Sequence, residues 1–325
     1  MGLASLAVPC DKCRVTVYGV NLPWLHGSYG HDLAINEHYP DWGYAFDPAR
    51  FAAPLDDAKA LGFDAVRVWL CEYAEGIVTE GERIVGVHPA LIENLTRLSE
   101  AASARSLSVY WTLLDANSVF RDDDALTQSI LTDAAQTARF AELVAAPIAR
   151  ALDPEVTYAL EAVNEPEVVT PSCVESGPSI AWADVGRALR TIGDAVRAER
   201  DLRVTAGTMH VFLDELFDSQ PALDAVDVHV YHDNGGLPPA SQLASFLGLP
   251  VGEGIPLIGG ECGLPEEGDA PPRRRLSHYL YNAAPSGYDA VFLWRLESWL
   301  VEQDASRTVT DAGKAVRMAF QQVKG

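Results

Sequence analysis

The chain has 325 residues, 48% of them apolar, so it can bury a large core as one barrel-type domain or as two ordinary domains. Its 46 acidic and 24 basic residues give a formal net charge of −22. A field of this sign repels nucleic acid and anionic membranes, which leaves a neutral small molecule or a neutral polymer as the expected partner.

The cysteines and the N-terminus indicate little special chemistry. The five cysteines are odd in number and irregularly spaced, so a disulfide framework is not expected. Cys10-x-x-Cys13 lacks the second pair of a typical zinc site, and we expect neither a metal nor a cofactor. Residues 1–9 lack the basic start of a secretory signal, and no run approaches the roughly 20 apolar residues of a membrane span. The expected location is cytoplasmic, although a trimmed, secreted form would look the same.

Apolar, β-rich runs alternate with helical patterns along the chain, which is typical of repeated βα units and a parallel sheet. The predicted strands are residues 15–22, 65–71, 108–114, 156–165, 203–209, 225–232, 255–262 and 290–297. The predicted helices are residues 55–61, 89–105, 134–150, 180–200, 212–220, 239–247, 273–284 and 311–321.

Eight such units in about 310 residues predict an α/β fold, a (β/α)8 TIM barrel in a single domain over residues 1–325, with residues 1–13 as an N-terminal extension. A doubly wound open sheet is the alternative, but no G-x-G-x-x-G or G-x-x-x-x-G-K-[ST] motif follows an early strand. The longest irregular segments, residues 23–54, 72–87 and 117–133, follow the first three strands. Because barrel sites are built from loops at the carboxyl ends of strands, these segments should wall the pocket.

Two glutamates stand at the polar ends of short apolar runs. Glu165 lies in the segment VNEP (163–166) and Glu261 in IGGEC (258–262). Cleavage of a glycosidic bond needs two carboxylates, because one protonates the leaving oxygen while the other attacks or stabilises the sugar cation. The pattern therefore predicts a glycoside hydrolase.

Other unusual polar and aromatic residues also fall at predicted strand ends. His229 and Tyr231 are two apart, so they point to the same face of a strand and can both reach the barrel mouth. Asn164 and Glu165 are neighbours and would face opposite sides, so both enter one pocket only if the strand twists or breaks there. Pro166 favours such a break, because it disfavours helical geometry at the preceding residue.

At these residues the chain resembles the clan A (β/α)8 glycoside hydrolases, and most closely glycoside hydrolase family 5, the cellulase and mannanase type. The order of the matching positions along the barrel carries the resemblance: Arg67, Asn164-Glu165-Pro166, His229-x-Tyr231, Glu261 and Trp294. It implies a retaining β-glycoside hydrolase that uses a two-glutamate double displacement. Glu165 would be the general acid/base and Glu261 the nucleophile.

The resemblance also implies roles for the neighbouring residues. Asn164 would hold the 2-hydroxyl of the reacting sugar, and Arg67 would steady the base of the site. His229 and Tyr231 would hydrogen-bond the glutamates and the sugar, while Trp294 would form the floor of the −1 subsite. Family 5 usually also has a histidine at the end of the third strand. This chain reads YWTLLDAN over residues 110–117, so Asp115 or Asn117 takes that place.

A retaining mechanism needs Glu165 protonated and Glu261 ionised at the start. Arg67 and a tyrosine hydroxyl beside Glu261 should favour its charged form. The charge of Glu261 should in turn raise the pKa of Glu165.

The loop after the first strand is rich in residues that bind sugars, including Tyr39 and Trp42. The expected sugar contacts are Trp24, His31 and Asp32. A long first loop closes a barrel mouth into a pocket, which favours exo action on a small β-glycoside or oligosaccharide. Endo action on a β-1,4-glucan or mannan is the alternative.

Two other classes of protein remain open. A metal-dependent barrel hydrolase is suggested by His229, His232 and Asp233 in one segment, but such enzymes usually present His-x-His at the end of the first strand, where this chain has NLPW (21–24). A non-catalytic sugar-binding barrel is expected to lack a catalytic carboxylate, and both are present here.

Overall fold

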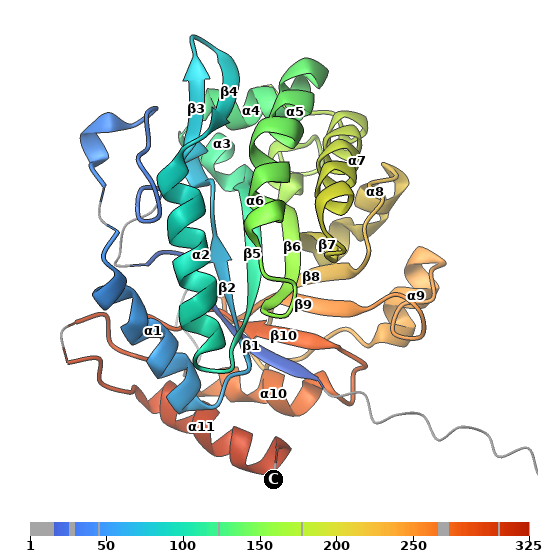
Figure 1. Cartoon of the computed structure of the whole chain (residues 1–325). Coiled ribbons are helices and arrows are strands. Elements are labelled where there is room, and N and C mark those ends of the chain that lie inside the picture. Colours follow the sequence, from blue (N-terminus) through green and yellow to red (C-terminus); the bar gives the residue numbers. More distant parts are fainter. Residues whose placement is uncertain are drawn as a thin grey trace, which may run out of the picture.

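The computed structural model describes residues 16–25, 30–44, 46–122, 124–176, 178–265, 273–304 and 306–324 (Figure 1). The predicted extension 1–13, with Cys10 and Cys13, lies outside these residues. The other three cysteines, Cys71, Cys173 and Cys262, are free thiols.

Eight parallel strands close into a barrel in the order β1-β10-β9-β8-β7-β6-β5-β2. The barrel strands are β1 (Val17–Leu22), β2 (Ala65–Trp69), β5 (Ser108–Asp115), β6 (Thr157–Asn164), β7 (Val204–Met209), β8 (Val226–Tyr231), β9 (Leu257–Gly263) and β10 (Ala290–Leu293). Each matches a strand predicted from the sequence, with ends that differ by a few residues. The predicted (β/α)8 barrel is confirmed.

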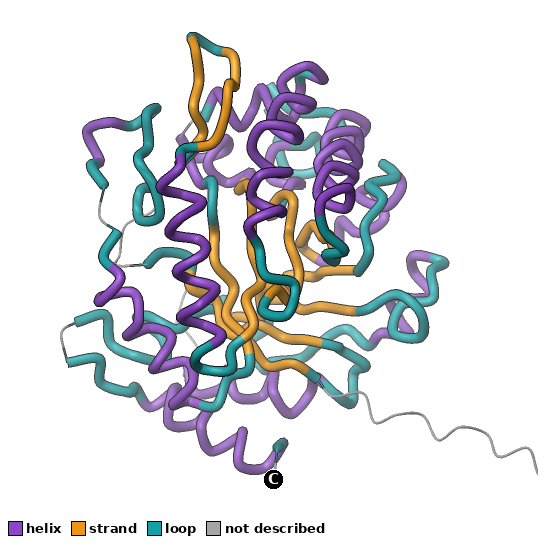
Figure 2. The backbone as a smooth tube through the Cα atoms, in the orientation of Figure 1, coloured by secondary structure: helices purple, strands orange, loops and turns teal. Residues whose placement is uncertain are grey.

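Helices surround the barrel, as the purple segments outside the orange strands show in Figure 2. The α-helices are α1 (Pro48–Leu61), α2 (Pro89–Ser103), α3 (Ala116–Asp122), α4 (Ala125–Thr132), α5 (Ala134–Phe140), α6 (Ala146–Ala151), α7 (Trp182–Glu199), α8 (Leu213–Asp218), α9 (Ala240–Leu247), α10 (Ser277–Ala283) and α11 (Asp311–Val323). Among the residues described, no helix combines the length and the apolar character that crossing a membrane requires.

Two prolines change the helices from the predicted course. Pro54 lies inside α1, which begins at Pro48, so the predicted start at residue 55 was wrong. One proline removes a single backbone hydrogen bond, and the helix continues past it. The predicted helix 134–150 is α5 and α6 joined by a π-turn, Ala141–Ala145. This turn comes just before Pro147, where a wider turn avoids the clash of the ring with the carbonyl four residues earlier.

Two of the predicted loops contain regular structure that the sequence analysis missed. The segment 72–87 holds the antiparallel hairpin β3 (Ile77–Glu80) and β4 (Arg83–Val87). The segment 117–133 contains most of α3 and all of α4, whose N-cap is Asp124. These elements follow β2 and β5, so they extend the wall at the carboxyl ends of the strands.

The barrel interior is apolar at the base and polar above it. Tyr110 and Phe292 fill the base together with alanines from several strands. A Cβ on Gly19 would lie 2.2 Å from the Phe292 ring, so only glycine fits there. Above this layer, Asp227 accepts hydrogen bonds from the Tyr110 hydroxyl and from the Gly260 amide. A buried polar layer therefore supports the strand ends.

Close helix packing at Gly186 gives a test of the fold. A Cβ at this position of α7 would lie 2.2 Å from the carbonyl oxygen of Ser219, directly after α8. We expect Gly186→Ala to lower the free energy of unfolding by about 1–3 kcal/mol in urea titrations, because backbone must move to admit the methyl group. Gly86→Ala in β4 is the control, since a Cβ there meets nothing within 4 Å. Equal stability of the two variants would contradict this packing.

Candidate active site

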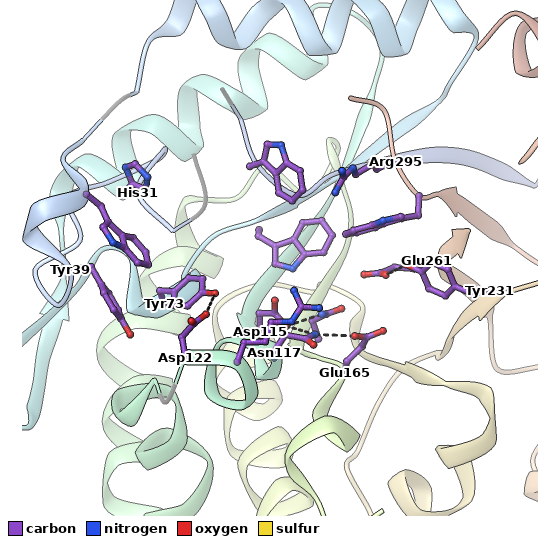
Figure 3. A pocket seen from close by; sticks show the side chains of 16 residues that line it. His31, Tyr39, Tyr73, Asp115, Asn117, Asp122, Glu165, Tyr231, Glu261 and Arg295 are labelled. Atoms are coloured by element: carbon purple, nitrogen blue, oxygen red, sulfur yellow. Dashed lines mark hydrogen bonds between the residues drawn. The ribbon is translucent and has the colours of Figure 1, made fainter. Parts of the chain in front are cut away.

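The carboxyl ends of the barrel strands open into a cavity of about 1210 Å³ (Figure 3). Seven of the residues predicted to form the site line it: Trp24, His31, Asn164, Glu165, Tyr231, Glu261 and Trp294. Arg67 and His229 are almost fully buried beneath the cavity and reach it through hydrogen bonds to the lining residues. The structure thus brings together residues that are far apart in sequence.

Glu165 directly follows β6 and has a left-handed backbone, with φ 46° and ψ 54°. Its amide donates a 2.9 Å hydrogen bond to the carbonyl of Gly207 in β7. This turn lets Asn164 and Glu165 both line the cavity, which an extended strand would not permit. The break predicted at Pro166 is present, but it is left-handed, whereas a residue before proline normally adopts extended geometry.

Glu261 lies on β9 and is held at both carboxylate oxygens. The Arg67 Nη1 atom donates to Oε1 at 2.8 Å, and the Tyr231 hydroxyl donates to Oε2 at 2.5 Å. Only 4% of Glu261 is exposed. The carboxylate is therefore fixed in direction and mostly desolvated.

His229 on β8 lies between the two glutamates. Its Nδ1 atom is 2.8 Å from Glu165 Oε1 and 3.9 Å from Glu261 Oε1. One side-chain atom from each of the three residues lies within 4.8 Å of the others. The two carboxylates and one imidazole thus form a single electrostatic unit.

Arg67 on β2 supports the base of this unit. Its Nη2 atom donates to Glu161 Oε2 at 2.5 Å and to Asn164 Oδ1 at 2.7 Å. Glu161 also accepts hydrogen bonds from the Thr112 hydroxyl and from the Gly207 amide. Glu161 is fully buried and does not line the cavity, so its charge serves to balance Arg67.

Asp115 and Asn117 stand where family 5 usually has a histidine, and both line the cavity. The Asn117 Nδ2 atom donates to Glu165 Oε2 at 2.9 Å and to Asp115 Oδ1 at 3.0 Å. Asp115 Oδ1 also accepts from Asn164 Nδ2 at 2.9 Å. Asn117 therefore orients the carboxylate of Glu165 directly, and Asp115 orients both asparagines.

Of the three residues predicted to contact the sugar from the first loop, Asp32 does not reach the cavity. Trp24 and His31 line the cavity, but Asp32 does not. The Asp32 carboxylate turns into the protein, where Oδ2 accepts a 2.5 Å hydrogen bond from the Leu25 amide. Its predicted contact with a sugar was wrong, because the carboxylate is needed inside the loop to satisfy a buried N–H group.

Sequence patterns alone did not single out Tyr73, Arg121, Asp122 and Arg295, which also line the cavity. The first three come from segments expected to wall the pocket, so their region was predicted but not the individual side chains. Arg295 follows Trp294, and β10 ends at Leu293, so strand alternation no longer applies there. The Arg295 guanidinium lies 4.4 Å from the ring centroid of Trp24, a cation–π contact between two residues that line the cavity.

The metal site suggested by His229, His232 and Asp233 does not form. His232 and Asp233 are exposed, and neither belongs to the possible metal-binding groups of the described residues. Those two groups are Glu161–Asp227–His229 and Glu165–His229–Glu261. Arg67 hydrogen-bonds to a carboxylate of each, so a divalent cation would meet a guanidinium at short range. The donor sets fit a metal poorly.

The pKa shifts run opposite to those expected from the sequence. Burial alone would raise the pKa of Glu165, but the hydrogen bond and charge of His229, with help from Asn117, lower it to about 2. Burial favours neutral His229, yet the charge of Glu261 and the bond to Glu165 raise the pKa of His229 to about 10. Burial also raises the pKa of Glu261 above its ordinary value, although His229 and Arg67 oppose this. The difference arises because His229 lies between the two glutamates, where its positive charge favours the ionised form of Glu165.

No family model matches the chain, and no curated protein is similar to it in sequence. Solved structures do match. The β-1,4-mannanase of the sea hare Aplysia kurodai has a TM-score of 0.70 at 17% identity, covering 97% of this chain and 94% of that one. The endo-1,4-β-mannanase of Eisenia fetida has a TM-score of 0.68 at 18% identity, covering 94% and 91%.

A GH5_18 protein from Streptomyces cattleya, solved in complex with GlcNAc, has a TM-score of 0.69 at 19% identity and covers 96% of this chain and 81% of that one. The chain has the fold of these family 5 glycoside hydrolases. The fold expected from the resemblance in sequence is therefore confirmed. The likeness extends over nearly the whole barrel.

Asp32 gives a test of the buried first loop. Burial raises the pKa of Asp32 from 3.8 to about 8, and burial together with the charge of Asp32 raises the pKa of the neighbouring Glu75 carboxyl. The folded state thus holds a proton that the unfolded state releases, so stability is lost as pH rises from about 4 to 8. We expect Asp32→Asn to flatten this loss in urea titrations between pH 5 and 9.

Exposed Asp41, on the same loop, provides the matched control, and Asp41→Asn should keep the pH dependence of the unaltered protein. Parallel stability curves for Asp32→Asn and the unaltered protein would show that Asp32 is ionised in the fold throughout this range.

Proposed function

We propose that the protein is a retaining β-glycoside hydrolase with Glu165 as general acid/base and Glu261 as nucleophile. One observation carries the proposal: one oxygen of the Glu165 carboxylate lies within 4.8 Å of one oxygen of the Glu261 carboxylate. Retaining glycosidases hold their carboxyl groups roughly 5 Å apart, whereas inverting enzymes need about 6.5–9.5 Å to admit a water molecule. The barrel fold shared with β-mannanases supports the same chemistry.

In the proposed reaction, Glu261 attacks the anomeric carbon while Glu165 protonates the glycosidic oxygen. The leaving group departs and a covalent glycosyl-enzyme remains. Glu165 then removes a proton from water, which attacks the same carbon and releases Glu261. Arg67 and Tyr231 hold the two oxygens of Glu261 and so limit its carboxylate to the direction of attack.

Further residues are proposed to bind the sugar from the walls of the cavity. Asn164 is fixed by Arg67 and Asp115 and would hold the 2-hydroxyl of the reacting sugar. Trp294 would form the floor of the −1 subsite. Trp24 and His31 line the cavity and would contact the substrate from the first loop. The substrate class that follows is a neutral β-glycoside or oligosaccharide.

The proton for the acid step is held by the pair Glu165 and His229. In the free site it resides on His229, because the pKa of the imidazole is about 10 and that of Glu165 about 2. The two atoms that share it are 2.8 Å apart, so transfer from Nδ1 to Oε1 requires no movement of either side chain. Glu165 then protonates the leaving oxygen, and the pair regains its proton when Glu165 activates water.

We further propose exo action, in which one terminal sugar is removed. Arg295 lies over the rings of both Trp24 and Trp294, so these aromatic and cationic groups would close one end of the cavity beside the proposed −1 subsite. A closed end accepts a chain terminus but not the middle of a polymer. The first loop is held against the second by Glu75, which accepts hydrogen bonds from the Leu33 and Ala34 amides.

Replacement of each glutamate tests the assignment of roles. On aryl β-glycosides, beginning with β-mannosides, Glu261→Ala should lose at least about 10⁴-fold in kcat, because the covalent step is removed. Glu165→Ala should retain activity only on substrates with good leaving groups, and azide should accelerate it by replacing the water that needs a base. Nitrophenol release measures both.

Two controls accompany this experiment. Incubation with EDTA should leave turnover unchanged, which separates the proposal from a metal-dependent hydrolase. Full activity of Glu261→Gln on any glycoside would contradict the assignment of Glu261 as the nucleophile. Binding of oligosaccharides without cleavage of any of them would instead favour a sugar-binding barrel.

The pH dependence of kcat/KM tests the shared proton. Activity should fall on the acid side when Glu261 is protonated, at a pH above its ordinary 4.5, and on the alkaline side when the pair Glu165 and His229 loses its proton. In His229→Gln, Glu165 must hold the proton without its imidazole partner, so the alkaline limb should move to lower pH. The substrate must have a sugar as leaving group, since only then does the acid step limit the rate. An unmoved alkaline limb would exclude His229 as the holder of the proton.

A further inference from the structure

A further buried carboxyl lies next to the proposed acid/base and has no part in the proposed reaction. Glu167 follows Glu165 by two residues, in the short 3-10 turn Pro166–Val169 after β6. It is fully buried and does not line the cavity, so it cannot touch a substrate there. A glutamate is rarely buried without a partner, because desolvation of its charge costs free energy. The role of Glu167 must therefore lie in the protein groups that it holds.

The backbone at Glu165 departs from the regular ladder between β6 and β7, which lie side by side in Figure 1. The Glu165 amide still donates to the Gly207 carbonyl at 2.9 Å. In a regular parallel ladder, the next bond would run from the Met209 amide to the Glu165 carbonyl. The left-handed backbone of Glu165 turns this carbonyl away, and it accepts from the Val168 amide at 3.2 Å instead. The Met209 amide therefore needs another acceptor.

The Glu167 side chain supplies this acceptor. Met209, the last residue of β7, donates its amide to Glu167 Oε1 at 2.8 Å. The backbone of Glu167 is held as well, since its carbonyl accepts from the Thr170 amide at 3.0 Å and from the Thr170 hydroxyl at 2.9 Å. One residue thus joins the end of β7 to the turn that carries Glu165, in place of a backbone hydrogen bond.

The strand end that Glu167 holds lies beside both residues that share the proton. Met209 on β7 is the register partner of His229 on β8, and His229 Nδ1 is 2.8 Å from Glu165 Oε1. A φ of 46° is costly for a glutamate, and the proline that follows favours an extended residue instead. Such a conformation persists only where surrounding contacts impose it. The bond between Glu167 and Met209 is one of these contacts.

We propose that Glu167 is a positioning residue for the acid/base: by holding the end of β7, it fixes the left-handed turn that aims the Glu165 carboxyl at the glycosidic oxygen. This inference rests on the proposed glycosidase activity. Proton transfer requires the two oxygens to be within hydrogen-bonding distance, so a small displacement of Glu165 weakens the acid step. Glu261 is held by Arg67 and Tyr231 and does not depend on this contact.

Two substrates of the same sugar separate the acid step from the rest of the reaction. β-1,4-Mannobiose has a sugar leaving group that needs a proton, whereas 2,4-dinitrophenyl β-mannoside releases a phenolate that does not. If the unaltered protein prefers another β-sugar, the disaccharide and dinitrophenyl glycoside of that sugar are used. The measured quantity is kcat/KM, which reports the steps up to departure of the leaving group, before Glu165 acts as a base.

Glu167→Ala should affect the two substrates unequally. We expect kcat/KM to fall roughly 100-fold on the disaccharide, as for a misplacement of about 1 Å, and by less than about threefold on the dinitrophenyl glycoside. A loss of general stability, or a displaced nucleophile, would lower both alike. Should Glu167→Ala fail to fold, Glu167→Asp replaces it, because its carboxyl is one methylene shorter and falls short of the Met209 amide.

Glu167→Gln is the conservative variant. Its amide oxygen can still accept from the Met209 amide. Burial, together with the charge of Glu165, raises the pKa of Glu167 to about 7, so at pH 6 most of the native carboxyl is neutral as well. At this pH, Glu167→Gln should keep kcat/KM on the disaccharide within about threefold of the unaltered protein.

The matched control is Asp224→Ala, at the opposite end of β7. The Asp224 Oδ2 atom accepts from the Val204 amide, also at 2.8 Å, so this change removes a similar bond from the same strand. It should leave kcat/KM unchanged on both substrates.

Three results would overturn the inference and leave the glycosidase proposal standing. These are equal losses of Glu167→Ala on the two substrates, no loss on either, and a loss in Glu167→Gln as large as that in Glu167→Ala. Turnover of no disaccharide and no dinitrophenyl glycoside by the unaltered protein would overturn the proposed function itself.

Discussion

A single buried guanidinium organises the candidate site. Arg67 is fully buried and donates hydrogen bonds to Asn21 on β1, to Glu161 and Asn164 at β6, and to Glu261 on β9. A charge without water is tolerated only when its donors are paired, and the planar fork of arginine can serve several acceptors at fixed angles. The relative positions of three other strands at the barrel mouth are thus tied to one side chain. Removal of Arg67 would leave two buried carboxylates without their counter-charge.

The charges around Arg67 also explain why the site is protonated as it is. Arg67 forms ion pairs with both Glu161 and Glu261. Its charge does not outweigh the effect of burial on Glu261, so the pKa of Glu261 is raised. Glu165 is the partner of His229: against the effect of burial, the hydrogen bond and charge of His229 lower the pKa of Glu165, and the two glutamates raise the pKa of His229. The same three groups would provide a nucleophile, an acid and a store for the proton without any of them moving. This division follows from which partner each carboxylate contacts, because the residue type is the same in both cases.

The loops give the cavity two unlike ends. Beside the proposed −1 subsite, Arg295 packs on Trp24 and limits the space. On the opposite side of the cavity, Tyr73 joins the first loop to α3 through its contact with the Trp42 ring and its hydrogen bond to Asp122. Both ends are built by segments that follow barrel strands, so the barrel provides a rigid base and the loops determine which ligands fit.

Sequence patterns were enough to predict the barrel, the order of its strands and the placement of Glu165 and Glu261 at strand ends. These follow from local patterns: apolar runs of strand length, helical spacing between them, and a polar residue where each run ends. Arg67, His229 and Tyr231 were placed at strand ends for the same reason, and carboxyl ends of parallel strands must meet at one mouth. Asn117 was recognised only as a candidate, since its contact with Glu165 joins two different strand ends.

The remaining features of the site depend on contacts between segments that are far apart in the chain. Adjacent residues of similar polarity separate in the fold: His31 lines the cavity, while Asp32 turns inward to a buried amide. The left-handed backbone of Glu165 and Tyr73 depends on hydrogen bonds from other segments, and neither residue type favours it. The pKa directions depend on His229, which is 64 residues from Glu165 in sequence and 2.8 Å from it in space. Local patterns specify which elements form, but distances between residues far apart in the chain set the charges and contacts that make a site.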